Sequence, residues 1–251
     1  QRQQSCLSRQ QHRDMLGAQN NLAGMYNNGD GVPQDMAKAA ALYDQAASQG
    51  DAKAQLYLAA MYHNGLGVPQ HKAKAAELFE QAASQGHAQA QCNLAAMYNS
   101  GNGVTQDMAK AVQLFEQAAS QGHADAQHNL AAMYFTGDGA PQDMVKAAEL
   151  HEQAASQGHA EAQHHLAHMY HNGLGVPQDM AKAAQLFEQA ASQGHAKAQQ
   201  ALAALRQQTP GAMRCQRQPH LSERQLLEQV AAQGDLAAQA KLQEVLYSCP
   251  G

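Results

Sequence analysis

The sequence repeats itself every 36 residues, and this period constrains the fold more than any other feature. The consensus, best followed from Ala52 to His87, is Ala-x-Ala-Gln-x-x-Leu-Ala-x-Met-Tyr-x-x-Gly-x-Gly-Val-Pro-Gln-Asp, then Lys-Ala-Ala and Ala-Ala-Ser-Gln-Gly-His. Further copies begin at Leu16, Ala88, Ala124 and Ala160. A fixed period of this length is typical of stacked small units, in which each unit contacts its neighbours, rather than of a globular domain.

Apolar residues within each unit fall at helical spacing in two separate stretches. In the copy that starts at residue 52, the pattern predicts a first helix over about 52–64 with Asp51 as its N-cap. The glycines and proline of 65–69 then predict a turn. A second helix is expected to begin after a capping Asp and to end at the Gly of Ser-Gln-Gly. The other first helices have histidine at the capping position: His87, His123, His159 and His195.

Alanine recurs where neighbouring helices should touch. Such small side chains allow close approach of the backbones, while Leu, Met, Tyr and Phe fill the remaining space. The sequence therefore predicts an all-α fold, a right-handed superhelical solenoid of 36-residue helix–turn–helix units. The alanines of the first helices are Ala23, Ala59, Ala95, Ala131, Ala167 and Ala203.

The repeat pattern divides the chain into four segments. Residues 1–15 do not match the unit and are interpreted as an N-terminal arm or cap, and residues 16–195 contain five complete repeats. Residues 196–235 are predicted to form a degenerate sixth repeat, and residues 236–251 a C-terminal capping helix and tail.

Composition excludes some classes of partner. The net charge is −5 and no long Lys/Arg-rich stretch is present, so nucleic acid is not expected as a partner. No apolar run approaches the roughly 20 residues that cross a bilayer, which predicts a soluble chain without direct membrane insertion. The compartment is left open because the first residue is Gln1 and a targeting peptide could precede it. Cys215 and Cys249 could pair if the environment is oxidising.

The quoted motif resembles Sel1-like repeats, which are relatives of the tetratricopeptide repeat, over about residues 16–246. The resemblance implies an adaptor that brings other proteins together, including in membrane-associated assemblies. The chain departs from the family where many relatives carry Trp in the second helix. It also lacks the regular cysteine pairs of the branch associated with β-lactam binding or hydrolysis. The residues at the Trp position are Tyr43, Phe79, Phe115, His151 and Phe187.

Candidate binding residues come from the first helices, which are expected to line a concave face. Counting from the first residue of each unit, such as Ala52, positions 2, 5, 6, 9, 12 and 13 should point into this face. These positions vary between units whose core positions barely change, although drift on an unused surface would look the same. An Asn series at position 6 could pair with an extended peptide backbone or belong to helix packing. The predicted partner-binding residues are Asn21, Tyr57, Asn93, Asn129, His128, Phe135, His164, His168, His171, Asp125 and Glu161.

Histidines are concentrated in one region of this predicted face. His164, His168 and His171 share one helix face, with His128 reaching from the preceding unit, and together could bind Zn²⁺. Clustering by chance in a chain with 14 histidines is the alternative, and the sequence alone assigns no metal or cofactor.

No catalytic motif stands out. Serines occur mainly in the Ala-Ala-Ser-Gln-Gly segments, and the Gly-x-Gly turns connect two helices rather than a strand and a helix. The sequence therefore predicts a non-enzymatic scaffold that binds a protein or peptide, with a His-based metal binder as one alternative. A ligand-binding or β-lactam hydrolase-like relative is another, and turnover of nitrocefin would separate it from the scaffold.

Overall fold

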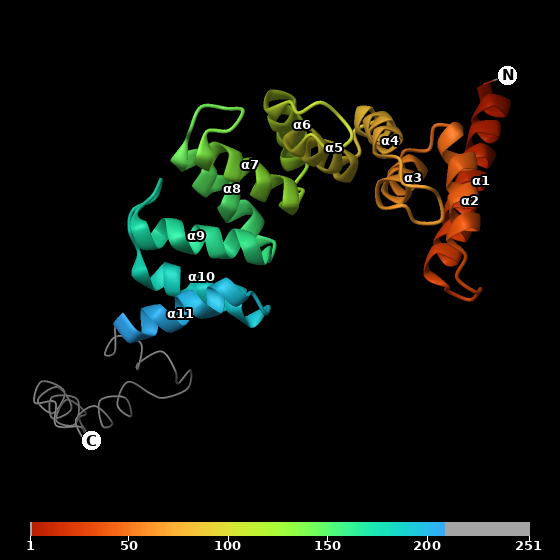
Figure 1. The fold of residues 1–251 in the computed structure, drawn as a ribbon. Helices are drawn as coiled ribbons and strands as arrows, with labels where there is room; N and C mark the ends of the chain where they lie inside the picture. Colours follow the sequence, from red (N-terminus) through yellow and green to blue (C-terminus); the bar gives the residue numbers. More distant parts are fainter. Residues whose placement is uncertain (1, 209–251) are drawn as a thin grey trace, which may run out of the picture. The chain divides into compact units, whose positions relative to one another are not determined.

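A computed structural model describes the backbone of residues 2–208 and the side chains of residues 15–205. The described residues form eleven α-helices and no strand, as Figure 1 shows. The helices are α1 Arg2–Asn28, α2 Met36–Ser48, α3 Ala52–Asn64, α4 Lys72–Ser84, α5 Ala88–Ser100, α6 Met108–Ser120, α7 Ala124–Thr136, α8 Met144–Ser156, α9 Ala160–Asn172, α10 Met180–Ser192 and α11 Ala196–Gln208.

Helices follow one another in space as they do in the sequence. The chain divides into two units, Gln1–Ala198 and Gln199–Gly251. Within the first unit, each helix from α1 to α9 packs against the next helix along the chain, up to α10. This arrangement confirms the predicted all-α solenoid of helix pairs. No helix in residues 2–208 combines the length and the apolar character that crossing a membrane requires.

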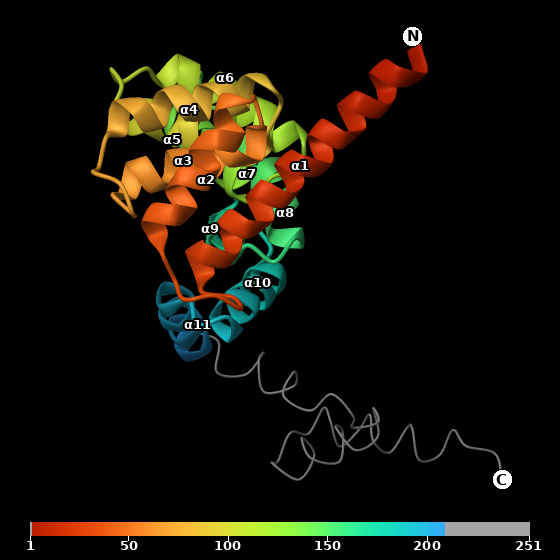
Figure 2. The same cartoon turned by 90° about the vertical axis from the view of Figure 1, so that its right-hand side faces the viewer.

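The N-terminal helix is longer than one repeat requires. α1 covers residues 2–28, so residues 2–15, interpreted from the sequence as an arm or cap, continue into the first repeat without a break. No proline or glycine interrupts residues 2–16, which explains the continuity. Figure 2 shows this part of α1 extending past the other helices. Beyond α11, residues 209–251, which include Cys215, Cys249 and the predicted capping helix, lie outside the described residues.

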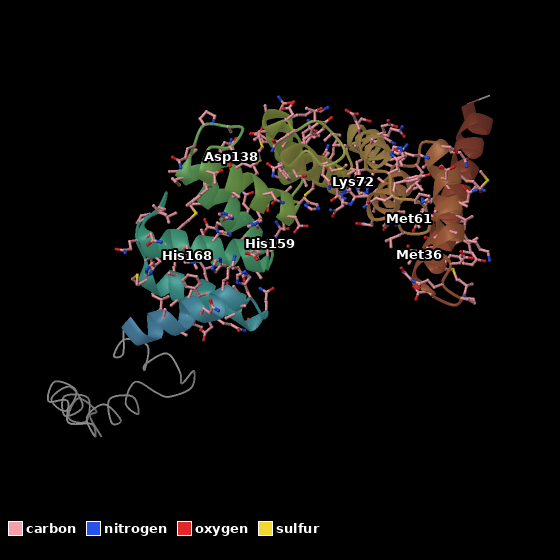
Figure 3. All side chains as sticks on the ribbon, viewed as in Figure 1. Met36, Met61, Lys72, Asp138, His159 and His168 are labelled. Atoms are coloured by element: carbon pink, nitrogen blue, oxygen red, sulfur yellow. The ribbon has the colours of Figure 1, made fainter. Side chains whose placement is uncertain are left out.

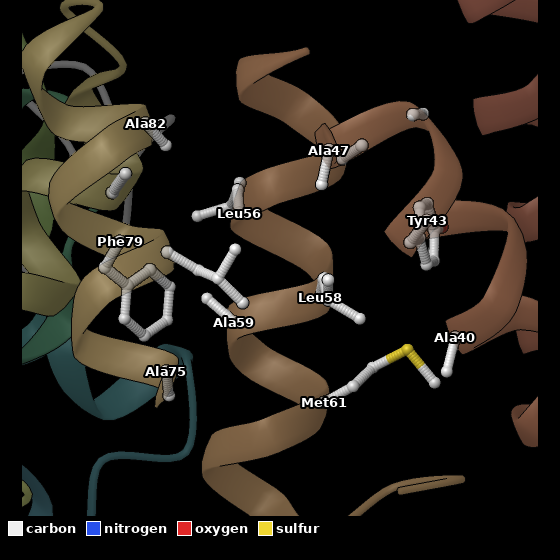
Figure 4. Packing of buried hydrophobic residues seen from close by; sticks show 14 of the residues in the cluster. Ala40, Tyr43, Ala47, Leu56, Leu58, Ala59, Met61, Ala75, Phe79 and Ala82 are labelled. Carbon is white, nitrogen blue, oxygen red and sulfur yellow. The ribbon is translucent and has the colours of Figure 1, made fainter. Parts of the chain in front are cut away.

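The core consists of small residues between larger ones. Leu58 and Met61 of α3 point toward Tyr43 of α2, as seen in Figure 4. On the other side of α3, Leu56 and Ala59 face α4. Because alanine has no side chain beyond Cβ, neighbouring helices approach closely at these positions. Five of the six alanines predicted at the contacts are 0% exposed: Ala23, Ala59, Ala95, Ala131 and Ala167. The prediction is wrong for Ala203, which is exposed on α11, because α11 is the last described helix and no described helix follows to cover it.

A buried glutamine at position 4 connects three elements by hydrogen bonds in each internal repeat. Gln127 Nε2 donates to the carbonyl oxygen of Ala119 in α6 at 3.3 Å. Its Oε1 accepts from Gln157 Nε2, just after α8, at 2.7 Å. A buried amide that is hydrogen-bonded on both sides avoids the cost of an unpaired polar group. Gln55, Gln91 and Gln163 make the same two kinds of bond.

Histidine caps connect successive first helices. His123, His159 and His195 each accept, through Nδ1, from a backbone N–H in the first turn of the helix they cap. A nitrogen that accepts carries no proton, so the ring proton must be on Nε2. That nitrogen faces an acceptor at position 2 of the preceding first helix. The pairs are His123 with Gln89 at 2.9 Å, His159 with Asp125 at 3.1 Å and His195 with Glu161 at 3.0 Å.

The fourth capping histidine lacks this arrangement. His87 makes no side-chain hydrogen bond to α5, and its Nδ1 is buried without a partner among the described residues. Position 2 of the preceding first helix is Lys53, which has only donors. Without an acceptor for Nε2–H, nothing fixes the tautomer that would allow Nδ1 to cap the helix.

Lys53→Gln is therefore expected to raise the free energy of unfolding by about 0.5–1 kcal/mol, because the new amide oxygen can accept from His87 Nε2. Urea unfolding followed by circular dichroism measures the change. Lys53→Met is the matched control, since it removes the charge without adding an acceptor. Equal stability of the two variants would show that a missing acceptor is not the reason why His87 fails to cap α5.

Candidate functional site

We define the first-helix face as the surface formed by positions 2, 6, 9 and 12 of α1, α3, α5, α7 and α9. Side chains at these positions are exposed or half-buried throughout. Position 5, predicted to share this face, differs: Leu56, Cys92 and His164 are only 8%, 5% and 7% exposed. Position 5 lies about 60° around the helix from the buried position 8, so it falls at the border of the core. The side chain of His164 therefore offers little surface to a partner.

A pocket of about 380 Å³ lies on the first-helix face between α3 and α5. Ala60, Ala96 and Met97 form part of its lining, and Phe79 of α4 contributes an aromatic ring. Asn102 Nδ2 donates to His63 Nε2 at 3.3 Å across the pocket, which links the turn after α5 to α3. The remaining lining residues are polar: His63, Asn64, Asn93, Ser100 and Asn102.

The Asn series at position 6 is not uniform. Asn93 lines the pocket, and its Oδ1 accepts from Gln89 Nε2 at 3.0 Å. Asn129 Nδ2 instead donates to the backbone oxygen of Asp125 in its own helix at 2.8 Å. Asn21 is exposed. The donor of Asn129 is thus used within the helix, whereas Asn93 faces a space that a ligand can enter.

The other predicted face residues lie outside this pocket. Tyr57 is 40% exposed, with its ring centroid 5.2 Å from that of Tyr43. Phe135 is half-buried on α7. Asp125 and Glu161 are exposed at position 2, where their carboxylates face the capping histidines His159 and His195. Their replacement would disturb the contact between successive first helices as well as the face itself.

The histidines form two neighbouring groups rather than one stripe. In the first group, His128 of α7 lies 5.3 Å from His151 of α8, 4.8 Å from His159 and 5.5 Å from His165 between ring centroids. The rings of His151 and His165 are stacked 5.4 Å apart. Among the described residues, no ring contact joins His128 directly to His164 or His168, and the two groups meet through His165, whose ring lies edge-on to that of His164 with the centroids 5.3 Å apart.

The second group surrounds α9. His164 and His168 are one helical turn apart, and their Nε2 atoms lie 3.2 Å from each other. Both rings pack edge-on against Phe187 of α10. His164 also lies 4.7 Å from the ring of His195. Figure 3 labels His168 on α9, together with His159 at the start of that helix. His171 makes no ring contact in the described part of the chain.

Burial lowers the pKa of the histidines in both groups. The pKa of His151 falls from its ordinary value of 6.5 to about 3, mainly because the ring is buried and also because His128 and His165 are close. Burial lowers the pKa of His128 and of His164 to about 4, and it also lowers those of His165 and His168. All of these imidazoles are therefore neutral at pH 7 and can accept or coordinate through a free electron pair.

His151 and the capping histidines were not among the predicted site residues. His151 occupies a second-helix position that is Phe or Tyr in the other repeats, and this exception is the sequence signal from which it could have been identified. The capping histidines look purely local in sequence. Their approach to His128 and His164 depends on how successive helix pairs stack, which the period does not specify.

Lysines of the second helices also have partners that the sequence did not indicate. Lys74 and Lys110 donate to the hydroxyls of Tyr62 and Tyr98 at 2.7 and 2.6 Å, and each ammonium also lies over the tyrosine ring. The hydrogen bond raises the pKa of both lysines. The same pairing joins Lys146 to Tyr134 and Lys182 to Tyr170. The lysine series is thus part of the repeat structure.

A reactive thiol is not apparent at the one cysteine whose side chain is described. Burial raises the pKa of Cys92 to about 12, which keeps it protonated at neutral pH. A protonated thiol is a poor nucleophile and a poor metal ligand.

Solved structures of similar proteins share this architecture. The chain is 34% identical to the protective antigen c5321 of uropathogenic Escherichia coli, described as displaying an SLR fold, with a TM-score of 0.74 over 95% of this chain. It spans only 50% of the length of that antigen. A Sel1 repeat protein from Oxalobacter formigenes is 30% identical over 74% of each chain, with a TM-score of 0.71. A comparison with the curated proteins gives no match.

The family comparison agrees with the helix pairs. The Sel1 repeat model matches residues 17–51, 52–87, 88–123, 124–159 and 160–195 in succession. Each match spans one first helix, its turn and one second helix of the structure. With more than half of its residues matched in this way, the chain belongs to the Sel1 repeat family.

Proposed function

We propose that this protein is a non-catalytic scaffold that binds a peptide or a protein subunit through its first-helix face. Sel1 repeat proteins generally mediate protein–protein interactions. The observation that carries the proposal is the pocket between α3 and α5, which joins an apolar floor to a rim of amide, hydroxyl and imidazole groups. Such a combination is typical of sites that bury an apolar side chain while pairing with the polar groups of a partner.

The residues at the helix positions that line the pocket differ from those at the same positions of other repeats, as recognition of a specific partner would require. Its helix positions 6, 9 and 12 carry Asn93, Ala60, Ala96 and His63, whereas α9 carries three histidines at the same positions. The core alanines beneath are unchanged. Packing accounts for the constant positions, and partner recognition is our explanation for the variable ones. The proposal extends to membership of a larger complex, including a membrane-associated one.

Ala96→Trp is expected to reduce recovery of the partner by about tenfold or more, because the indole would fill the pocket from an exposed position without entering the core. Crosslinking in the native source followed by mass spectrometry measures recovery. Ala109→Trp is the matched control, since Ala109 is exposed on α6 of the same helix pair and does not line the pocket.

Partners lost with Ala96→Trp and retained with Ala109→Trp would support the pocket. Equal recovery with both variants, or loss with Ala109→Trp alone, would place binding elsewhere on the protein. Ala95→Trp is unsuitable as a control because Ala95 is completely buried and the larger side chain would overpack the helix stack.

A further inference from the structure

Position 9 of α9 departs from the other repeats. The other first helices have Gly24, Ala60, Ala96 and Ala132 there, and α9 has His168. Position 5, one turn earlier, varies between repeats and is His164 in α9, where α3 has Leu56 and α7 has His128. Of the five first helices α1, α3, α5, α7 and α9, only α9 has imidazoles at both positions, and they face each other.

The separation of these two rings suits a metal ion. Their Nε2 atoms are 3.2 Å apart. Two nitrogens bound to tetrahedral Zn²⁺ at about 2.0–2.1 Å lie about 3.3–3.4 Å from each other, so an ion fits with little movement. Imidazoles one turn apart on a helix can therefore coordinate the same ion without a change in the backbone.

The potential ligands around the pair do not all converge. Among the described residues, one group of potential metal ligands brings its ligand atoms within 4.8 Å of one another, and it consists of Glu161, His164 and His195, without His168. His195 is poorly suited as a ligand, because its Nδ1 accepts from the N–H of Ala198 and its proton is therefore on Nε2. That Nε2 lies 3.0 Å from Glu161 Oε2, so the carboxylate is already engaged by the capping histidine. The two facing imidazoles are therefore the ligand set that the geometry supports.

Packing does not require an imidazole at position 5 of α9. The His164 side chain is 7% exposed, and Leu56 shows that an apolar side chain fits the same position. The Nδ1 of His164 is buried without a hydrogen-bond partner among the described residues, and its Nε2 is the nitrogen that faces His168. His168 is exposed, so an ion can reach the pair from solvent.

We propose that His164 and His168 form a two-imidazole binding site for a divalent transition metal ion such as Zn²⁺. Imidazole ligands favour such ions over Mg²⁺ or Ca²⁺, which take oxygen ligands. The site is on α9, apart from the partner pocket between α3 and α5, and does not depend on the proposed scaffold function. His128 and His171, included in the sequence hypothesis, are not part of this ligand set.

Calorimetric titration of the chelator-treated full chain with ZnCl₂ tests the proposal. The unmodified protein is expected to bind Zn²⁺ at this site, and His168→Ala to weaken that binding by at least about tenfold, as loss of a metal ligand should. His164→Leu is expected to act similarly. Both substitutions place a residue already present at the equivalent position of another repeat, Ala60 or Leu56, so the fold should be retained.

His63→Asn is the matched control, because it removes a histidine of the first-helix face outside both groups and places the residue found at Asn27 and Asn99. Absorption of bound Co²⁺ provides an independent readout, with the bands of a tetrahedral complex expected in the unmodified protein and lost in His168→Ala. Absence of Zn²⁺ binding to the unmodified chain, or equal affinity of His168→Ala and His63→Asn, would overturn the proposal. Neither result would bear on partner binding, which is measured separately with Ala96→Trp.

Discussion

Gly139→Ala is expected to lower the free energy of unfolding by about 3–5 kcal/mol. Gly139, in the turn after α7, has φ +76°, a conformation that costs an L-residue about 1–2 kcal/mol. An added Cβ would also lie 2.6 Å from the carbonyl oxygen of Met108, the first residue of α6 in the preceding helix pair. Since a backbone atom cannot move as freely as the end of a side chain, neighbouring pairs would have to separate. Urea unfolding followed by circular dichroism measures the loss.

Gly158→Ala separates the two causes of this loss. Gly158, after α8, has a similar φ of +86°, but an added Cβ would meet nothing within 4 Å. This variant is expected to lose only about 1–2 kcal/mol. If Gly139→Ala and Gly158→Ala destabilise the protein equally, the close approach to Met108 has no energetic role.

His151→Phe is expected to stabilise the protein at neutral pH and to stabilise it further in acid. His151 is 2% exposed and its Nδ1 has no partner among the described residues, so phenylalanine removes an unpaired polar atom worth about 1–3 kcal/mol. The aromatic side chains at this position of α4, α6 and α10, Phe79, Phe115 and Phe187, show that the space accepts a phenyl ring.

The effect in acid follows from the pKa of His151. Burial and the nearby rings of His128, His159 and His165 hold that pKa at about 3 in the folded protein, below the ordinary 6.5 of an unfolded chain. As the pH falls below about 6.5, the unfolded chain takes up the proton first and is stabilised relative to the folded protein. At about 1.4 kcal/mol per pH unit, this one group costs about 2 kcal/mol of stability by pH 5, and the loss continues toward pH 3.

Unfolding free energies at pH 7.5 and pH 5 check this prediction. The difference between His151→Phe and the unmodified protein should grow by about 2 kcal/mol between the two values. His63→Asn, outside the histidine groups, is the control for loss of an imidazole. A constant difference across this range would mean that His151 titrates alike in the folded and unfolded chains.

Much of the fold follows from the period, because the same pattern of helices, caps and turns recurs in each repeat. The first helix predicted at about residues 52–64 is α3, and the predicted capping residues Asp51 and Asp107 accept from backbone N–H groups of their helices. Five of the six predicted contact alanines are buried as expected, and Ala203 is exposed. These features depend on local spacing and on side-chain size, both of which a sequence shows directly.

Contacts between repeats were harder to predict. Position 5 is buried because the following cap and second helix cover it, as His195 and Phe187 do for His164. His128 meets His165 rather than His164 for the same reason, since the rotation from one helix pair to the next decides which side chains touch. The recurring glutamine of the motif was visible in the sequence, but its two hydrogen bonds were not, because they join it to residues 8 and 30 positions away.

Each capping histidine needs an acceptor in the preceding repeat to fix its tautomer, so the modules of this array cannot be exchanged freely. Whether His87, His123, His159 or His195 makes a side-chain cap to its helix depends on a residue in the previous module, and Lys53 is the example in which that condition fails. Shuffling or deleting a 36-residue cassette would therefore change the stability of its successor, even with every internal sequence left intact.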